Sequence, residues 1–111
     1  MAHDEELAHR IRELLAEEDD LSEMAMFGGL AFLLAGNMTV AVSSRGGLMV
    51  RVGAGAHEDA LARSHVEPME MRGRPMTGWI RVMPEGLRTR RQLSAWVARA
   101  VAFARTLPPK G

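Results

Sequence analysis

The chain has 111 residues, of which 25% are charged and 47% are apolar, and these values are typical of one folded domain. It contains no cysteine, which excludes disulfides and thiolate metal sites. The first residues are acidic, unlike those of a signal peptide, and the longest mainly apolar stretch, residues 24–35, is too short to span a bilayer. We therefore expect a single cytoplasmic domain over residues 1–111, with an ordered core at about 4–108 and no membrane association.

The 14 basic and 14 acidic residues balance in number but are separated along the sequence. Residues 1–71 carry five arginines against 13 acids, whereas residues 72–111 carry eight arginines and Lys110 against Glu85 alone. Such a separation indicates either a charged contact surface or two halves that fold against each other and pair their charges. We favour the second interpretation, because exposed charges mostly serve solvation.

The first half of the sequence predicts one helix followed by an antiparallel meander. Asp4 can cap a helix that carries apolar residues at every third or fourth position and ends near Ala16. Apolar residues then recur at every second position, with Met38, Val40 and Val42 expected on one face. Gly36-Asn37 is expected to form a type II′ hairpin turn, with the glycine at positive φ. The predicted strands are residues 30–35, 38–42 and 48–52, with 24–27 as an optional extra strand.

The second half predicts a short helix, two strands and a long last helix. Residues 56–64 form the short helix and residues 68–72 and 77–83 the strands. The last helix begins with a capping box, Thr89 and Gln92, and is stopped by Pro108-Pro109. The resulting fold class is α+β in the order α-β(3-4)-α-β(2)-α, with one antiparallel β-sheet and helices packed mainly on one face.

No set of residues predicts a reaction centre. Gly53-Ala54-Gly55 follows a strand and opens a helix as a dinucleotide loop does, but Glu58 takes the place of the third glycine and would repel a pyrophosphate. The four histidines have no metal-ligand spacing, and no serine lies in a nucleophile elbow. We therefore expect no catalytic residues, no metal and no cofactor.

Nine methionines are many for this length, and they suit either irregular core gaps or adaptable protein-binding surfaces. We interpret them mainly as core filling, since alternate strand positions face the core. Trp79 opposes Ile80 and Val82 in its strand, so it can lie on the sheet face that the helices leave uncovered. There it would stack a base or anchor a partner protein, with three nearby arginines, although packing against neighbouring side chains is the interpretation that we favour. These arginines are Arg72, Arg74 and Arg81.

Three further arginines, Arg88, Arg90 and Arg91, crowd the start of the last helix, where the helix dipole disfavours positive charge. Either an anion-binding patch or salt bridges to acids of the first helix would account for them. They complete the candidate interaction surface.

Several blocks of the sequence resemble the TfoX/Sxy N-terminal domain family. They are MFGGLAF at 26–32, GNM at 36–38, MRGRPMTGW at 71–79 and LSAWV at 93–97, and together the resemblance covers about residues 4–108. The resemblance implies the same α-β-α-β-α order, with an antiparallel sheet similar to that of secretion chaperones. It implies structural roles for Phe27, Gly28, Gly29 and Gly73, and no catalytic residues.

The founding members of this family regulate bacterial natural competence together with a transcription activator of the cyclic-AMP receptor type, and they carry a second, C-terminal domain. The resemblance therefore implies a stand-alone regulatory domain, not an enzyme, that binds a protein partner such as this activator and can form a homodimer. Two alternatives stay open: direct nucleic-acid binding through the arginine-rich segment 72–105, and a small-molecule or enzymatic site beneath the sheet.

Overall fold

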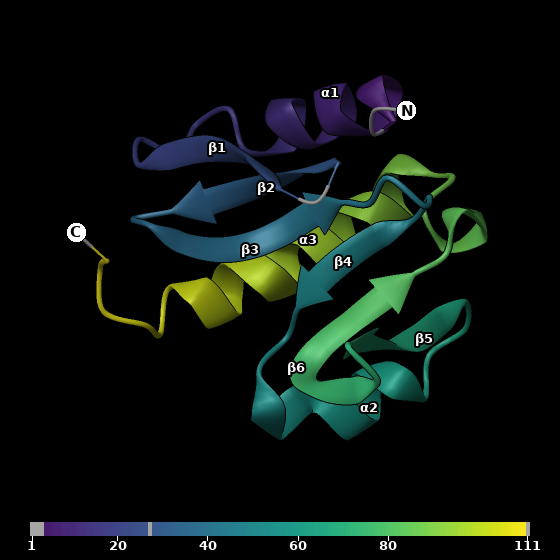
Figure 1. The fold of residues 1–111 in the computed structure, drawn as a ribbon. Coiled ribbons are helices and arrows are strands. Elements are labelled where there is room, and N and C mark those ends of the chain that lie inside the picture. Colours follow the sequence, from purple (N-terminus) through teal and green to yellow (C-terminus); the bar gives the residue numbers. More distant parts are fainter. Residues whose placement is uncertain (1–3, 27, 111) are drawn as a thin grey trace.

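The computed structural model describes residues 4–26 and 28–110 and shows one six-stranded sheet with three helices (Figure 1). All neighbouring strands are antiparallel, in the order β1-β2-β3-β4-β6-β5, which confirms the predicted α+β class. No helix in the described part has the length and apolar character needed to cross a membrane. The elements are α1 (Glu5–Leu14), β1 (Leu21–Met26), β2 (Gly29–Leu34), β3 (Asn37–Val42), β4 (Leu48–Arg51), α2 (His57–Leu61), β5 (Val66–Met71), β6 (Arg74–Val82) and α3 (Arg90–Ala104).

All three helices cover the same face of the sheet, here called the inner face. On it, Phe32, Val40, Val50 and Ile80 stand in register across four strands and are 0% exposed. Burying such side chains is the main favourable contribution to folding. The helices add their apolar residues to this single core, which includes Leu7, Ala8 and Ile11 of α1, Ala60 of α2, and Leu93, Trp96, Val97 and Ala100 of α3.

Helix α3 begins as the sequence predicts. The Thr89 hydroxyl accepts a hydrogen bond from the Gln92 N–H at 3.0 Å, and the Gln92 side chain accepts one from the Thr89 N–H at 2.9 Å. The helix ends at Ala104, before the prolines. The chain then returns to the β2–β3 hairpin, where the Lys110 N–H donates to the Ala35 carbonyl at 2.7 Å.

The prediction of a Gly36-Asn37 turn is wrong. Leu34 pairs with Asn37, so the two turn residues are Ala35 and Gly36, with φ of 52° and 82°. Two positive φ angles are the signature of a type I′ turn. Asn37 instead belongs to the strand, and its side chain donates to the Pro108 carbonyl at 2.9 Å. The sequence carries no signal for this turn because alanine seldom adopts a left-handed conformation.

A β-bulge in β3 changes which way Met38 faces. Phe32 pairs with Val40 but Leu33 pairs with Met38, so Thr39 is an extra residue in the ladder. The buried Thr39 hydroxyl donates to the Phe32 carbonyl at 2.7 Å, which satisfies a polar group that the bulge would otherwise leave unpaired. Met38 consequently lies on the opposite face from Val40, contrary to the simple alternation that the sequence predicts.

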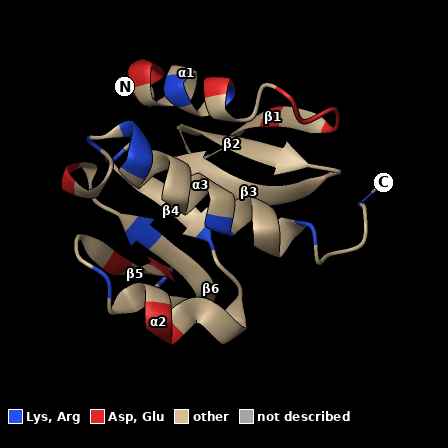
Figure 2. Cartoon of the chain, turned by 180° about the vertical axis from the view of Figure 1, so that it is seen from behind, with Lys and Arg blue, Asp and Glu red and all other residues tan. Residues whose placement is uncertain are grey.

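Ion pairs between the two halves of the chain bring acidic and basic residues together, although the sequence keeps them apart. Arg105 of the second half donates to Asp20 at 2.7 Å and also pairs with Glu18, while Arg99 donates to Asp59 at 2.7 Å. Figure 2 shows acidic and basic segments alternating over the helix-covered side. The expectation that the halves fold against each other is confirmed.

This pairing predicts a specific dependence of stability on pH. Hydrogen bonding to Arg105 lowers the pKa of Asp20 from its ordinary value of 3.8, so ionisation of Asp20 favours the folded state. That contribution is complete above about pH 4 and is lost as the pH falls through the lower folded-state pKa. In urea unfolding at decreasing pH, Arg105→Gln should therefore lose stability less steeply than the wild type.

The matched control for that measurement is Arg90→Gln, since Arg90 is exposed and has no ion pair among the described residues. It should keep the wild-type pH profile. Identical profiles for all three proteins would show that the Arg105–Asp20 pair does not contribute to folding.

Candidate docking site on the outer face of the sheet

The face of the sheet away from the helices, here called the outer face, carries a row of apolar side chains. Met24, Ala31, Ala41 and Met49 pair in register across β1 to β4, and Arg81 and then Glu67 continue the row. Ala31, Ala41 and Leu33 form a second, smaller apolar cluster, with Met26, Met38 and Met49 packed against it. The outer face of β1 to β4 consists of Ser22, Met24, Met26, Ala31, Leu33, Met38, Ala41, Met49 and Arg51.

The four methionines of this face lie outside the main core. Met24 is 49% exposed. Among the described residues it is the one large hydrophobic side chain that is exposed to solvent. Met26, Met38 and Met49 are half-buried. The interpretation of the methionines as core filling is therefore wrong for Met24, because β1 is an edge strand whose outer side is left open by the part of the chain that the structure describes. Flexible, polarisable thioethers at such positions suit a surface that adapts to a partner.

Arginines border the apolar row on the side of β4 and β6. The Arg51 guanidinium lies over the Trp79 ring at 6.0 Å and the Phe103 ring at 5.4 Å, which fixes its position by cation–π attraction. The Arg81 guanidinium donates to the carbonyls of Arg45 at 3.0 Å and Gly46 at 2.8 Å. No carboxylate forms an ion pair with Arg51 or Arg81 within residues 4–26 and 28–110, and with Glu67 in register beside Arg81 it is Arg51 that gives this border its net positive charge.

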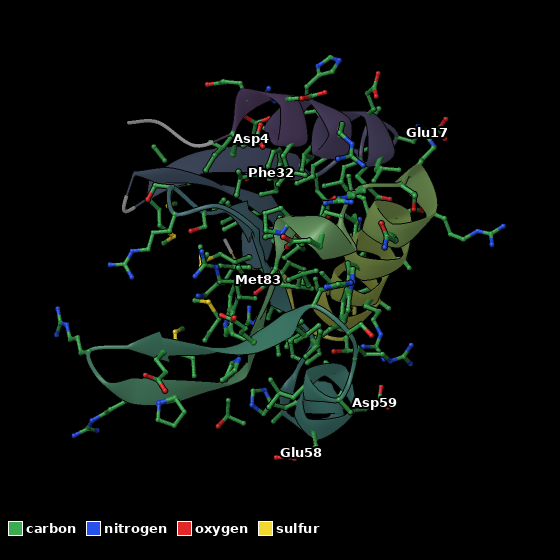
Figure 3. The ribbon with its side chains drawn as sticks, turned by 90° about the vertical axis from the view of Figure 1, so that its right-hand side faces the viewer. Asp4, Glu17, Phe32, Glu58, Asp59 and Met83 are labelled. Carbon is green, nitrogen blue, oxygen red and sulfur yellow. The ribbon has the colours of Figure 1, made fainter. Side chains whose placement is uncertain are left out.

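The structure divides the predicted surface residues among three places. Trp79, which is half-buried, and Arg81 lie on the outer face beside β4. Arg72 and Arg74 are exposed at the end of the β5–β6 hairpin, where Arg72 has a φ of 55°. Figure 3 shows this hairpin extending away from α3, to the side on which the outer face lies.

The third place is the start of α3 on the helix-covered side, where Arg88, Arg90 and Arg91 are all exposed. They form no ion pair with α1 in the described residues, so the interpretation as salt bridges to the first helix is wrong. Helix α1 instead contributes another positive charge near the start of α3, because the Arg10 guanidinium donates a hydrogen bond to the Leu87 carbonyl at 2.8 Å.

Of the motif residues with expected structural roles, Gly29 is the most constrained. An ideal Cβ on Gly29 would lie 2.3 Å from the Val42 carbonyl oxygen, so β2 and β3 approach too closely there for any side chain. Gly28 and Gly73 both have a φ of 79° and form turns. Phe27 lies outside the described residues.

Comparison with known proteins agrees with this fold. No curated protein matches the chain. The family model of the TfoX N-terminal domain matches residues 13–104, which run from the end of α1 through the whole sheet to the last residue of α3. The chain therefore belongs to the TfoX N-terminal domain family.

Proposed function

We propose that this domain is a non-enzymatic regulatory module that docks a partner protein on the outer face of its sheet. The observation that carries the proposal is the row of Met24, Ala31, Ala41 and Met49 on the face opposite the three helices, in which Met24 is 49% exposed and Met49 is half-buried while the two alanines are buried. An apolar strip with a charged border is the usual composition of a protein interface.

The charge around the strip favours a partner of a particular chemistry. Arg51 and Arg81 border it without a carboxylate partner among the described residues, so a matching segment would present apolar side chains flanked by Asp or Glu. A second copy of this chain matches that pattern poorly, because no Asp or Glu lies on the outer face of β1 to β4 and Glu67 of β5 already stands in register beside Arg81. The partner is therefore a different protein, and the family resemblance favours a transcription activator of the cyclic-AMP receptor type.

A pair of matched variants tests this assignment. Met24→Asp places a negative charge on the outer face, whereas Ala98→Asp places the same charge on the exposed side of α3. Truncating and charging a contact residue at an interface typically weakens binding by about tenfold or more. We expect Met24→Asp to weaken binding of the purified activator by at least that factor in titration calorimetry, and Ala98→Asp to leave it within about twofold of wild type.

Thermal unfolding of both variants should match the wild type, since both positions are exposed. Equal binding by Met24→Asp and wild type would contradict the docking site. An activator that does not bind the wild type would contradict the choice of partner, and sedimentation that shows a dimer abolished by Met24→Asp would make the occupant a second copy.

A further inference from the structure

A cleft of about 350 Å³ lies on the helix-covered side, between the start of α3 and the loop that joins α2 to β5. The side chains that line it include Arg63, His65, Arg91 and Arg99, together with Gln92, and no Asp or Glu. Three arginines converge here from segments that are far apart in the sequence. The cleft is separate from the outer face, because α3 covers the opposite side of the sheet (Figure 1).

Arg99 is held rigidly at the wall of this cleft. Its guanidinium lies over the Trp96 ring at 5.3 Å, and its Nη2 donates to Asp59 at 2.7 Å. Its Nη1 is buried and has no hydrogen-bond partner in the described part of the chain. The ring and the carboxylate together fix the guanidinium in place at the cleft.

The charge of the cleft exceeds what the chain itself neutralises. Asp59, labelled on α2 in Figure 3, also lies 3.7 Å from Arg63 and therefore offsets one of the three arginine charges. Arg91 has no ion pair among residues 4–26 and 28–110. The surplus of two positive charges matches a phosphate monoester, which carries close to two negative charges at neutral pH.

From this we infer that the cleft binds the phosphate group of a small ligand, with Arg91 and Arg99 donating hydrogen bonds to its oxygens. Arginine is the side chain best suited to such two-oxygen contacts. The volume is near the lower end for small-molecule sites, which fits a small phosphate ester. His65, which also lines the cleft, lies in the turn before β5 with a φ of 67°.

A nucleic acid fits these observations less well. Binding along a phosphate backbone requires a continuous basic surface. Arg105, which would extend the patch along α3, is engaged with Glu18 and Asp20. The positive charge is therefore concentrated at the cleft rather than spread along the helix.

The test is a titration of the ¹⁵N-labelled domain, followed by amide chemical shifts, with inorganic phosphate and with glycerol 3-phosphate at constant ionic strength. Two charge-assisted hydrogen bonds correspond to a Kd of about 1 mM. We expect saturable shifts at Gln92 and Ala95, which line the cleft. Tighter binding of the ester would identify a phosphate ester as the ligand, and tighter binding of inorganic phosphate would identify free phosphate.

Arg91→Gln and Arg90→Gln form the matched pair, because both arginines are exposed in the first turn of α3 but only Arg91 lines the cleft. Arg91→Gln should weaken phosphate binding about tenfold or more, and Arg90→Gln should change it less than about twofold. Equal losses in both variants, or shifts that sodium chloride reproduces, would overturn the inference. So would the absence of saturable shifts in the wild type, or a short DNA duplex that binds with equal dependence on Arg90 and Arg91.

Discussion

Replacing Phe32 with alanine is expected to destabilise the domain by about 3–5 kcal/mol, the usual cost of truncating a fully buried phenylalanine. Phe32 is 0% exposed and lies in the row with Val40, Val50 and Ile80 that the helices cover. Figure 3 shows it beneath α1. Because a whole domain is stable by only about 5–15 kcal/mol, this variant should unfold at a much lower urea concentration.

Met24→Ala is the control for this measurement, since it removes a large apolar side chain from the next strand but from the outer face. Its free energy of unfolding should stay within about 0.5 kcal/mol of wild type. A Phe32→Ala effect below about 1 kcal/mol, or equal effects of the two variants, would contradict the placement of the core on the inner face.

Replacing Gly29 with alanine is expected to cost about 2 kcal/mol or more, although only one methyl group is added. The new Cβ would lie 2.3 Å from the Val42 carbonyl oxygen, and this atom belongs to the backbone of β3 and cannot rotate away. The two strands must separate at the Leu30–Val42 pairing, which disturbs hydrogen bonds at the end of the β2–β3 ladder. Urea unfolding monitored by circular dichroism measures the loss.

Gly55→Ala provides the comparison, because a Cβ on Gly55 meets nothing within 4 Å and the residue has no positive φ. This variant should be neutral, or more stable by up to about 1 kcal/mol, since alanine restricts the unfolded chain. A Gly29→Ala protein as stable as Gly55→Ala would show that the motif glycine is not required by the packing of β2 against β3.

The parts of the fold that follow local rules could be predicted from the sequence. The capping box of Thr89 and Gln92 is present in the structure, and residues 24–26 of the optional strand are part of β1. The predictions that were wrong concern features that depend on the sheet as a whole. The bulge at Thr39 arises where β2 and β3 pair, and the left-handed Ala35 is held by a contact with Lys110 at the far end of the chain. Neither contact leaves a pattern in neighbouring residues.

The candidate site was predictable in outline only. The alternation around Trp79 placed it opposite Ile80 and Val82, and the structure puts it on the outer face. The methionine row was missed because strand order brings Met24 and Met49 into one line, and order cannot be derived from spacing within single strands. The bulge at Thr39 depends on how β2 pairs with β3, and it places Met38 on the outer face. Spacing within one strand therefore could not predict that Met38 belongs to this face.

Photo-crosslinking in cells from benzoylphenylalanine at position 24, compared with position 98 on α3, tests whether the outer face docks a different protein. We expect crosslinks from position 24 alone, to one apolar segment flanked by Asp or Glu, identified by mass spectrometry of the joined peptides. Crosslinks from position 98 alone, from neither position, or from position 24 only to a second copy of this chain would contradict it.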